Sequence, residues 1–203
     1  TFDSRVEDHV RRFWARVAEA AARTLRDLHI ERLIIGGPDE ATNAVRDLLP
    51  EVARQKVVGL VHLPARADRT EIQQRTLAVA LAEERRREAE LVAALFERAA
   101  AGRGAVLGTA ATVEALKLRQ AHIVVVARDL DGELYRCLTC GAVSTTNAER
   151  CPSCGGTMVR ISRAQVLPLL ARRSGARIEL VDETAVQALR AHEGIGAILR
   201  RPP

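Results

Sequence analysis

The chain has 203 residues, enough for one large or two small domains, and 47% of them are hydrophobic and 28% charged. No apolar run approaches the length of a membrane span, so the composition predicts a cytoplasmic protein with no membrane partner. The net charge is +5, and the excess lies in residues 101–203, because residues 1–100 carry equal numbers of acidic and basic side chains. This mild excess favours nucleic acid, but a solvated surface explains it equally well. Only 2% of the residues are aromatic, which argues against a platform for stacking bases.

The first half of the chain alternates between helical and strand-like patterns. Apolar residues at helical spacing from Val6 to Leu28 predict an amphipathic helix, with Asp3 or Ser4 as its cap. The next expected elements are a strand, a helix and a second strand, at residues 33–35, 39–50 and 56–63. This alternation predicts an α/β layer with a partly parallel sheet. Since the chain starts without Met or an apolar leader, we expect it to be a fragment.

A long helix is expected over residues 70–100, and its middle, AEERRREAE, has almost no apolar face. Such a helix is expected to bridge two bodies through solvent. Gly102 and Gly104 follow it, so we place the domain boundary there, with domains at 1–101 and 102–203. The second domain is expected to contain a helix capped by Thr109 or Thr112 and a buried strand over 122–127. Further expected elements are helices at 163–173 and 183–191 and strands at 176–181 and 194–200. The predicted fold class is therefore α/β, with two α/β sandwich domains joined by a long helix.

All four cysteines lie in one stretch, CLTCGAVSTTNAERCPSCGG, as two Cys-x-x-Cys pairs separated by ten residues. Each pair can direct two thiolates at one ion, and the glycine after each pair allows the turn to close. Four sulfurs suit tetrahedral Zn²⁺, so we predict a structural zinc ribbon inserted at about 131–160. Its ligands would be Cys137, Cys140, Cys151 and Cys154. Free thiols, disulfides, a redox pair and rubredoxin-type iron are the alternatives. Because four cysteines leave no vacant position, the zinc is expected to be structural.

Other candidate sites are few. The five histidines are scattered, and the sequence contains neither a phosphate-binding loop nor a nucleophile elbow. Arg11, Arg12 and Arg16 crowd one side of the first helix, where they form either a solvated face or contacts with RNA phosphates. From the residues alone we find no catalytic centre.

Several segments, taken in order, resemble the middle and C-terminal domains of the archaeal and eukaryotic class-1 peptide-chain release factors and their bacterial relatives. These segments are ARVAEAA, ERLIIGGP, VVGLV, the long charged helix, GTAATVEALKLRQAHIVVVARDL and GIGAILR. The cysteine segment also resembles the zinc-bearing insertion of the archaeal factors. The likeness covers nearly the whole chain, and its specificity comes from the shared order of segments that are each weak alone.

The resemblance implies a protein of the ribosomal A site, with rRNA and P-site tRNA as partners and a translational GTPase as an open possibility. In the family, a Gly-Gly-Gln loop helps water attack the ester of peptidyl-tRNA. These 203 residues contain no Gly-Gly-Gln; by the resemblance it would precede Thr1. No catalytic residue is therefore assigned. The resemblance gives weight to Arg11, Arg12 and Arg16 as RNA contacts, because the matching helix of the family is also basic.

Three functions remain open. The first is release-factor-like hydrolysis of peptidyl-tRNA in termination or rescue. The second is a non-catalytic hibernation or quality-control factor that occupies the A site. The third is a generic zinc-ribbon module that binds RNA. This function is the least favoured, because the ribbon carries few basic residues: Arg136, Arg150 and Arg160.

Overall fold

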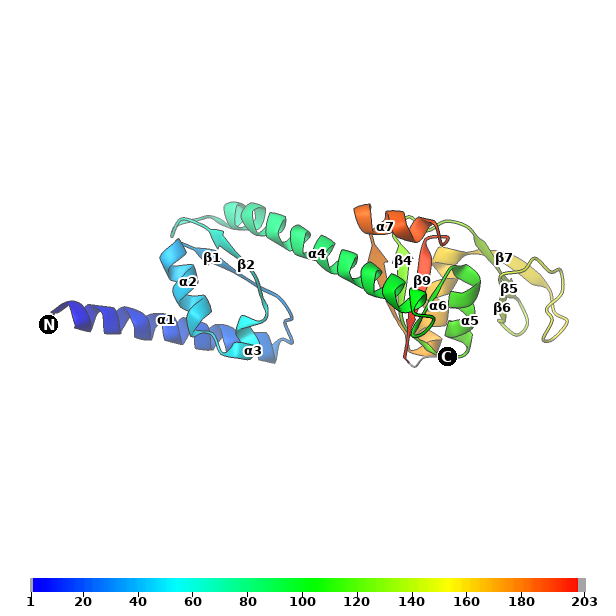
Figure 1. Ribbon diagram of the computed structural model, residues 1–203, viewed down its shortest axis with the longest axis horizontal. Coiled ribbons are helices and arrows are strands. Elements are labelled where there is room, and N and C mark those ends of the chain that lie inside the picture. The colour runs from blue at the N-terminus through cyan, green and yellow to red at the C-terminus, as the bar shows by residue number, and fades with distance from the viewer. Residues whose placement is uncertain (1, 201–203) are drawn as a thin grey trace. The chain divides into compact units, whose positions relative to one another are not determined.

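The computed structural model describes the backbone of residues 2–200, and the side-chain surroundings of residues 8–182 and 185–200 (Figure 1). The chain is a mixed α/β protein, which confirms the expected fold class at that level. It forms two compact units, residues 1–84 and 85–203, and helix α4 (Arg69–Ala100) has residues in both. The expected domain bounds, 1–101 and 102–203, stay a prediction. Among the described residues, no helix combines the length and the hydropathy needed to cross a lipid bilayer.

The first unit packs helices on a two-stranded parallel sheet. Its elements before α4 are α1 (Phe2–Asp27), β1 (Leu33–Gly37), α2 (Asp39–Leu48), α3 (Glu51–Arg54) and β2 (Val57–His62). The two strands run parallel, as the alternating pattern predicts, and pair from Leu33 opposite Val57 to Gly37 opposite His62. Helices α1 and α2 contact each other and enclose a small core of Ala18, Ala22, Leu25, Val45, Leu49 and Ala53.

Helix α1 differs from its sequence prediction in two respects. It begins at Phe2, so Asp3 and Ser4 lie inside the helix, and their expected role as its cap is wrong. Among the described side chains of this helix, the buried apolar residues are Ala18, Ala22 and Leu25, which pack in the core with α2. Phe13 is 46% exposed. The periodicity predicts the helix correctly, but burial depends on how far the partner element reaches along it.

The second unit is built on a four-stranded sheet with the order β3-β9-β4-β8. Its elements are β3 (Ala105–Leu107), α5 (Thr109–Lys117), β4 (Ala121–Ala127), α6 (Arg163–Ser174), β8 (Arg177–Val181), α7 (Glu183–Arg190) and β9 (Ile195–Leu199). Strand β4 runs parallel to β8 and antiparallel to β9. Val124 and Val126 of β4 belong to the core cluster that includes residues of α5 and α6, whereas Val125 and Ala127 belong to the cluster with α7 and the end of α4. From Ile123 onward the strand is packed on both faces, which explains the unbroken apolar run that ends it.

The charged middle of α4 is less uniform than its sequence indicates. Glu88 is only 9% exposed, and its Oε2 accepts a hydrogen bond of 2.9 Å from the backbone N–H of Asp182, just before α7. The Arg86 guanidinium pairs with Glu90, one turn further along the helix, at 2.5 Å. The expectation of a helix that is solvated all round in its middle is therefore wrong at Glu88.

Helix α5 is capped from a distant part of the chain. Its N-cap is Gly108, with φ of 83°, so the expected caps Thr109 and Thr112 are wrong. The Glu193 carboxylate accepts a 2.7 Å hydrogen bond from the backbone N–H of Thr109. This bond, with the Thr109 hydroxyl and the nearby charge of Arg163, lowers the pKa of Glu193 from its ordinary value of 4.5, although desolvation opposes the shift.

The cysteine insertion forms a small antiparallel sheet with the order β6-β5-β7. Its strands are β5 (Glu133–Cys137), β6 (Val143–Ser144) and β7 (Met158–Ser162), close to the segments expected from the sequence. The side chains of Leu134 and Val143 pack in the core cluster of the body, around β4. The insertion is therefore fixed to the body of the second unit on one side, and its two cysteine loops extend from the other (Figure 1).

Candidate metal centre

The two Cys-x-x-Cys loops have the same local geometry. The backbone N–H of Gly141 donates to the carbonyl of Cys137 at 3.0 Å, and the N–H of Gly155 donates to the carbonyl of Cys151 at 2.8 Å. Both glycines have a left-handed backbone, with φ of 71° and 73°. A residue with a side chain is strained in this region, so each loop closes most easily with glycine at this position.

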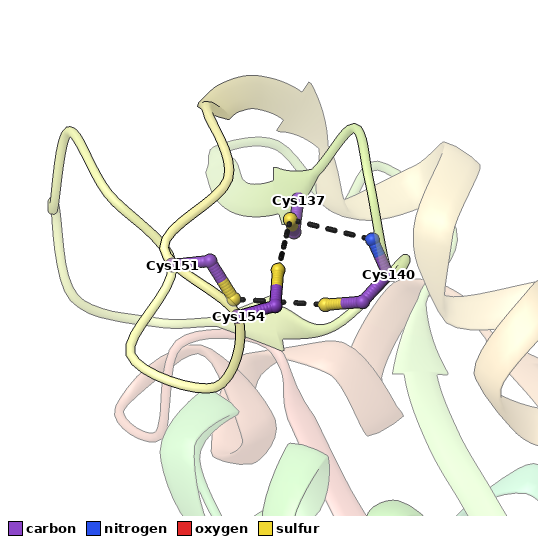
Figure 2. A group of neighbouring side chains, drawn as sticks. All are labelled: Cys137, Cys140, Cys151 and Cys154. Atoms are coloured by element: carbon purple, nitrogen blue, oxygen red, sulfur yellow. Dashed lines mark hydrogen bonds between the residues drawn. The ribbon is translucent and has the colours of Figure 1, made fainter.

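The four sulfur atoms converge between these loops (Figure 2). All four lie within 4.8 Å of one another. The Sγ atoms of Cys137 and Cys154 are 3.5 Å apart, and those of Cys140 and Cys151 are 3.6 Å apart. A disulfide would need about 2.05 Å, and all four thiols are free. Four sulfurs at about 2.3 Å from a tetrahedral zinc ion lie roughly 3.8 Å apart. The cluster is therefore compatible with a metal site, and its size fits zinc.

The local electrostatics suit a cation. The backbone N–H of Cys140 points at the sulfur of Cys137 at 3.5 Å. Mainly through this N–H, the pKa of the Cys137 thiol is lowered to about 6, so it is a thiolate at neutral pH. The pKa of Cys154 is raised to about 12: the Gly156 N–H lowers it, but the neighbouring Cys140 and Cys137 sulfurs and desolvation raise it more. The cluster thus resists holding several negative charges, and a divalent cation would relieve that repulsion.

The insertion has little apolar core of its own. The local cluster contains Cys137, Cys151 and Met158, with Tyr135 and Ala142 packed beside it. Cys137 and Cys151 are buried, whereas Cys140 and Cys154 are exposed. Two of the three buried residues of this cluster would therefore be metal ligands, and a segment of this size is too small to be stable through burial alone.

Arg163 fastens the base of the insertion to the body. Its Nε donates to the carbonyl of Asp131, where the insertion begins, at 2.5 Å, and one terminal nitrogen donates to the hydroxyl of Thr109 at 2.6 Å. Its side chain is only 13% exposed. A Cβ on Gly132 would lie 2.6 Å from this guanidinium, so glycine allows the close approach. Sequence reasoning missed this arginine because its partners lie more than thirty residues away.

The other predicted site residues lie in the first unit. Arg11, Arg12 and Arg16 are all exposed on α1, and among the described residues none of them forms an ion pair. Their predicted role as RNA contacts stays a prediction. The structure thus brings together the four cysteines and leaves these arginines on a helix of the other unit.

Residues 1–81, almost all of the first unit, match the family model of bacterial archaeo-eukaryotic release factor family 10. This first unit is therefore similar to that release-factor family. No curated protein sequence matches the chain.

Solved structures extend the likeness to the second unit. Dom34 of S. cerevisiae, described as a translation termination-like factor involved in RNA quality control, matches with a TM-score of 0.59 and 12% identity, over 96% of this chain and 54% of Dom34. Archaeal Pelota, from a model of ribosome-bound Pelota and ABCE1, matches with a TM-score of 0.57 and 20% identity, over 95% of this chain and 50% of Pelota. At these identities the likeness establishes a shared fold. The chain spans about half the length of both proteins.

Proposed function

We propose that this protein acts on the ribosome, where it enters the A site and promotes hydrolysis of peptidyl-tRNA in termination or rescue. One observation carries the proposal: the family match over residues 1–81 is continued by a fold likeness to Dom34 and Pelota over at least 95% of the chain. The Pelota structure is described as ribosome-bound. In this proposal the chain has two domains, residues 1–101 and 102–203, which together span the A site.

The proposed contribution of these residues is positioning. No Gly-Gly-Gln occurs in the sequence. The closest approach to an acid–base pair is His62, whose Nδ1 lies 2.9 Å from Asp39, but these side chains are 70% and 78% exposed. An exposed pair without a pocket is a poor general base. On this proposal Arg11, Arg12 and Arg16 hold α1 against rRNA or tRNA phosphates, and water attack depends on a loop outside these residues.

The proposed role of the cysteine cluster is structural. Cys137, Cys140, Cys151 and Cys154 would hold one Zn²⁺ as a zinc ribbon, and the sulfur separations of 3.5–3.6 Å support this. When bound, the ion would cross-link the two loops. It would take no part in chemistry on a substrate, because four thiolates complete its coordination. Metal binding would therefore add to the stability of the insertion.

A second candidate function is occupancy of an idle A site in hibernation or quality control. A protein that only blocks the site needs no hydrolytic loop, and the described residues contain no buried acid–base pair that would argue for hydrolysis. A translational GTPase partner would fit either function; Dom34 is described as interacting with Hbs1.

One experiment separates the two functions. The full-length protein is mixed with ribosomes that carry labelled peptidyl-tRNA in the P site, and both free peptide and ribosome pelleting are measured. Release of peptide at a rate above that of ribosomes alone supports hydrolysis. Pelleting without release supports occupancy. A protein that neither pellets nor releases peptide overturns both.

A further inference from the structure

A groove lies between the cysteine insertion and the body of the second unit. It has a volume of about 460 Å³ and is lined by both cysteine loops and by the C-terminal ends of α5 and α6. Three cations face it: Lys117 and Arg119 at the end of α5, and Arg173 in the last turn of α6. We call this the insertion groove. All of its lining belongs to the second unit.

Of the three cations, Lys117 has a carboxylate partner, Glu114 at 3.5 Å, whereas the two arginines have none among the described residues. Among the described residues, no Asp or Glu lines it. Arg119 and Arg173 are exposed, and within the described part of the chain neither guanidinium forms an ion pair. Elsewhere in this unit arginines are paired with carboxylates, for example Arg160 with Glu133 and Arg190 with Asp129. The groove thus brings together two guanidinium groups that have no carboxylate partner.

The backbone at Arg119 adds a second, independent observation. Helices α5 and α6 end in the same motif, in which the last two N–H groups turn back to earlier carbonyls: Gln120 to Ala115, and Ala176 to Ala171, each at 2.9 Å. The motif needs a left-handed residue, and glycine is the usual one. Helix α6 has Gly175 there, with φ of 72°, but α5 has Arg119, with φ of 57°.

A residue other than glycine in this conformation costs about 1 kcal/mol. The other residue of this unit with such a backbone, Glu193, uses its side chain to cap α5. The strain at Arg119 is explained if its side chain also has a role, and Arg119 lines the insertion groove.

We propose that the insertion groove binds the sugar–phosphate backbone of RNA, with Arg119, Arg173 and Lys117 as its phosphate contacts. Planar guanidinium groups match phosphate oxygens in pairs. No aromatic ring of the described residues lines the groove, so bases are not read by stacking. Leu170 is half-buried at the groove and supplies apolar surface for ribose. RNA is favoured over an acidic peptide because its phosphates are regularly spaced. Such a polyanion is attracted most strongly by the excess of basic residues in 101–203.

An alternative role for the same cations is to balance the charge of the tetrathiolate centre, which would be formally negative with zinc bound. The two roles predict different effects when the cations are removed. If the cations only balance the centre, their removal weakens zinc binding and leaves RNA binding unchanged. If they bind phosphate, the reverse holds. The proposal does not depend on the ribosomal role, because the probe is a free RNA.

The test uses the chain loaded with one equivalent of zinc and a fluorescent ten-nucleotide oligouridylate, with anisotropy measured from 50 to 500 mM salt. The variant is Arg119→Gln with Arg173→Gln. The matched control is Arg103→Gln with Arg172→Gln, which removes two exposed arginines outside the groove, one of them adjacent to Arg173. Each lost phosphate contact lowers the salt slope by about 0.7 for single strands, so the groove variant should lose about 1.4 in slope and about 25-fold in affinity at 0.1 M salt. The control should change far less.

A third variant, Arg119→Gly, separates binding from stability. It should weaken RNA binding while raising the melting temperature, because glycine removes the backbone strain at the end of α5. Zinc retention, followed with a chromophoric chelator, should be the same in all variants. Equal losses in the groove and control variants, faster zinc release with unchanged RNA binding, or tighter binding of oligoglutamate than of RNA would each overturn the proposal. Ribosome pelleting of the same variants tests the proposed function separately.

Discussion

Replacing Cys151 by serine should release the metal and unfold the cysteine insertion, while the first unit stays folded. Cys151 is only 2% exposed, and its sulfur lies 3.6 Å from that of Cys140. It would therefore coordinate directly any ion held between the sulfurs. A serine hydroxyl is not ionised at neutral pH and cannot replace a thiolate on zinc.

The size of the effect follows from the ligand count. Structural zinc sites with four ligands bind with about 10–16 kcal/mol at neutral pH, so one ligand contributes roughly 3 kcal/mol. This amounts to about a hundredfold weaker binding. Because the insertion's own buried cluster is Cys137, Cys151 and Met158, little else holds the two loops once the ion is lost. Leu134 and Val143 pack in the core of the body, so the unfolding should stop at the strands that contain them.

Two measurements read this out. Competition with a chromophoric chelator gives zinc stoichiometry and affinity, and hydrogen exchange with mass spectrometry shows which segments open. Exchange should rise in residues 138–157 and stay unchanged in residues 10–80. Ser153→Ala, in the same loop but without a ligand atom of the cluster, is the control.

Native wild-type protein that carries no metal would refute the reasoning, as would a Cys151→Ser variant that keeps zinc with undiminished affinity. Faster exchange throughout the first unit would show that the insertion is not the independent clip that its contacts indicate.

Three further predictions concern the body of the chain. Leu189→Ala, at a fully buried residue of α7, should cost about 2–5 kcal/mol in urea unfolding, and the half-exposed Leu169 far less; equal costs would contradict the assigned core. Glu193 has a pKa below 4.5, so its contribution is present above that pH and is lost as the pH falls through the folded-state pKa. Glu193→Gln should flatten this part of the melting-temperature profile, and parallel profiles would count against the cap. Arg11→Glu with Arg12→Glu should weaken ribosome pelleting at low salt; pelleting that stays unchanged at moderate salt would remove these contacts from the proposal.

Local patterns were enough to predict most elements of this fold. The strand at β4 was predicted because residues 123–127 are packed on both faces and are therefore all apolar. The cysteine cluster was predicted because Cys-x-x-Cys is a complete local motif, in which each turn needs only its own glycine. Both cases depend on residues that are adjacent in sequence.

The predictions that were wrong depend instead on residues that are distant in sequence. The cap of α5 comes from Glu193, more than eighty residues beyond Thr109, and Glu88 is buried because Asp182 begins another element beside it. Phe13 has the periodicity of a core residue but extends beyond its partner helix. No window of sequence contains these partners, so propensity and periodicity cannot find them.

The insertion groove shows how such a limit bears on function. Basic residues on the insertion itself are the obvious candidates for RNA contacts, but Arg160 pairs with Glu133 and Arg150 donates to the carbonyl of Gly155 in its own loop. The free cations come instead from the ends of two helices of the body, which the fold brings to the insertion. One local signal was present in the sequence: α6 is followed by glycine, whereas α5 is followed by Arg119 at the equivalent position. An arginine at a position where glycine would be less strained supports a role for its side chain.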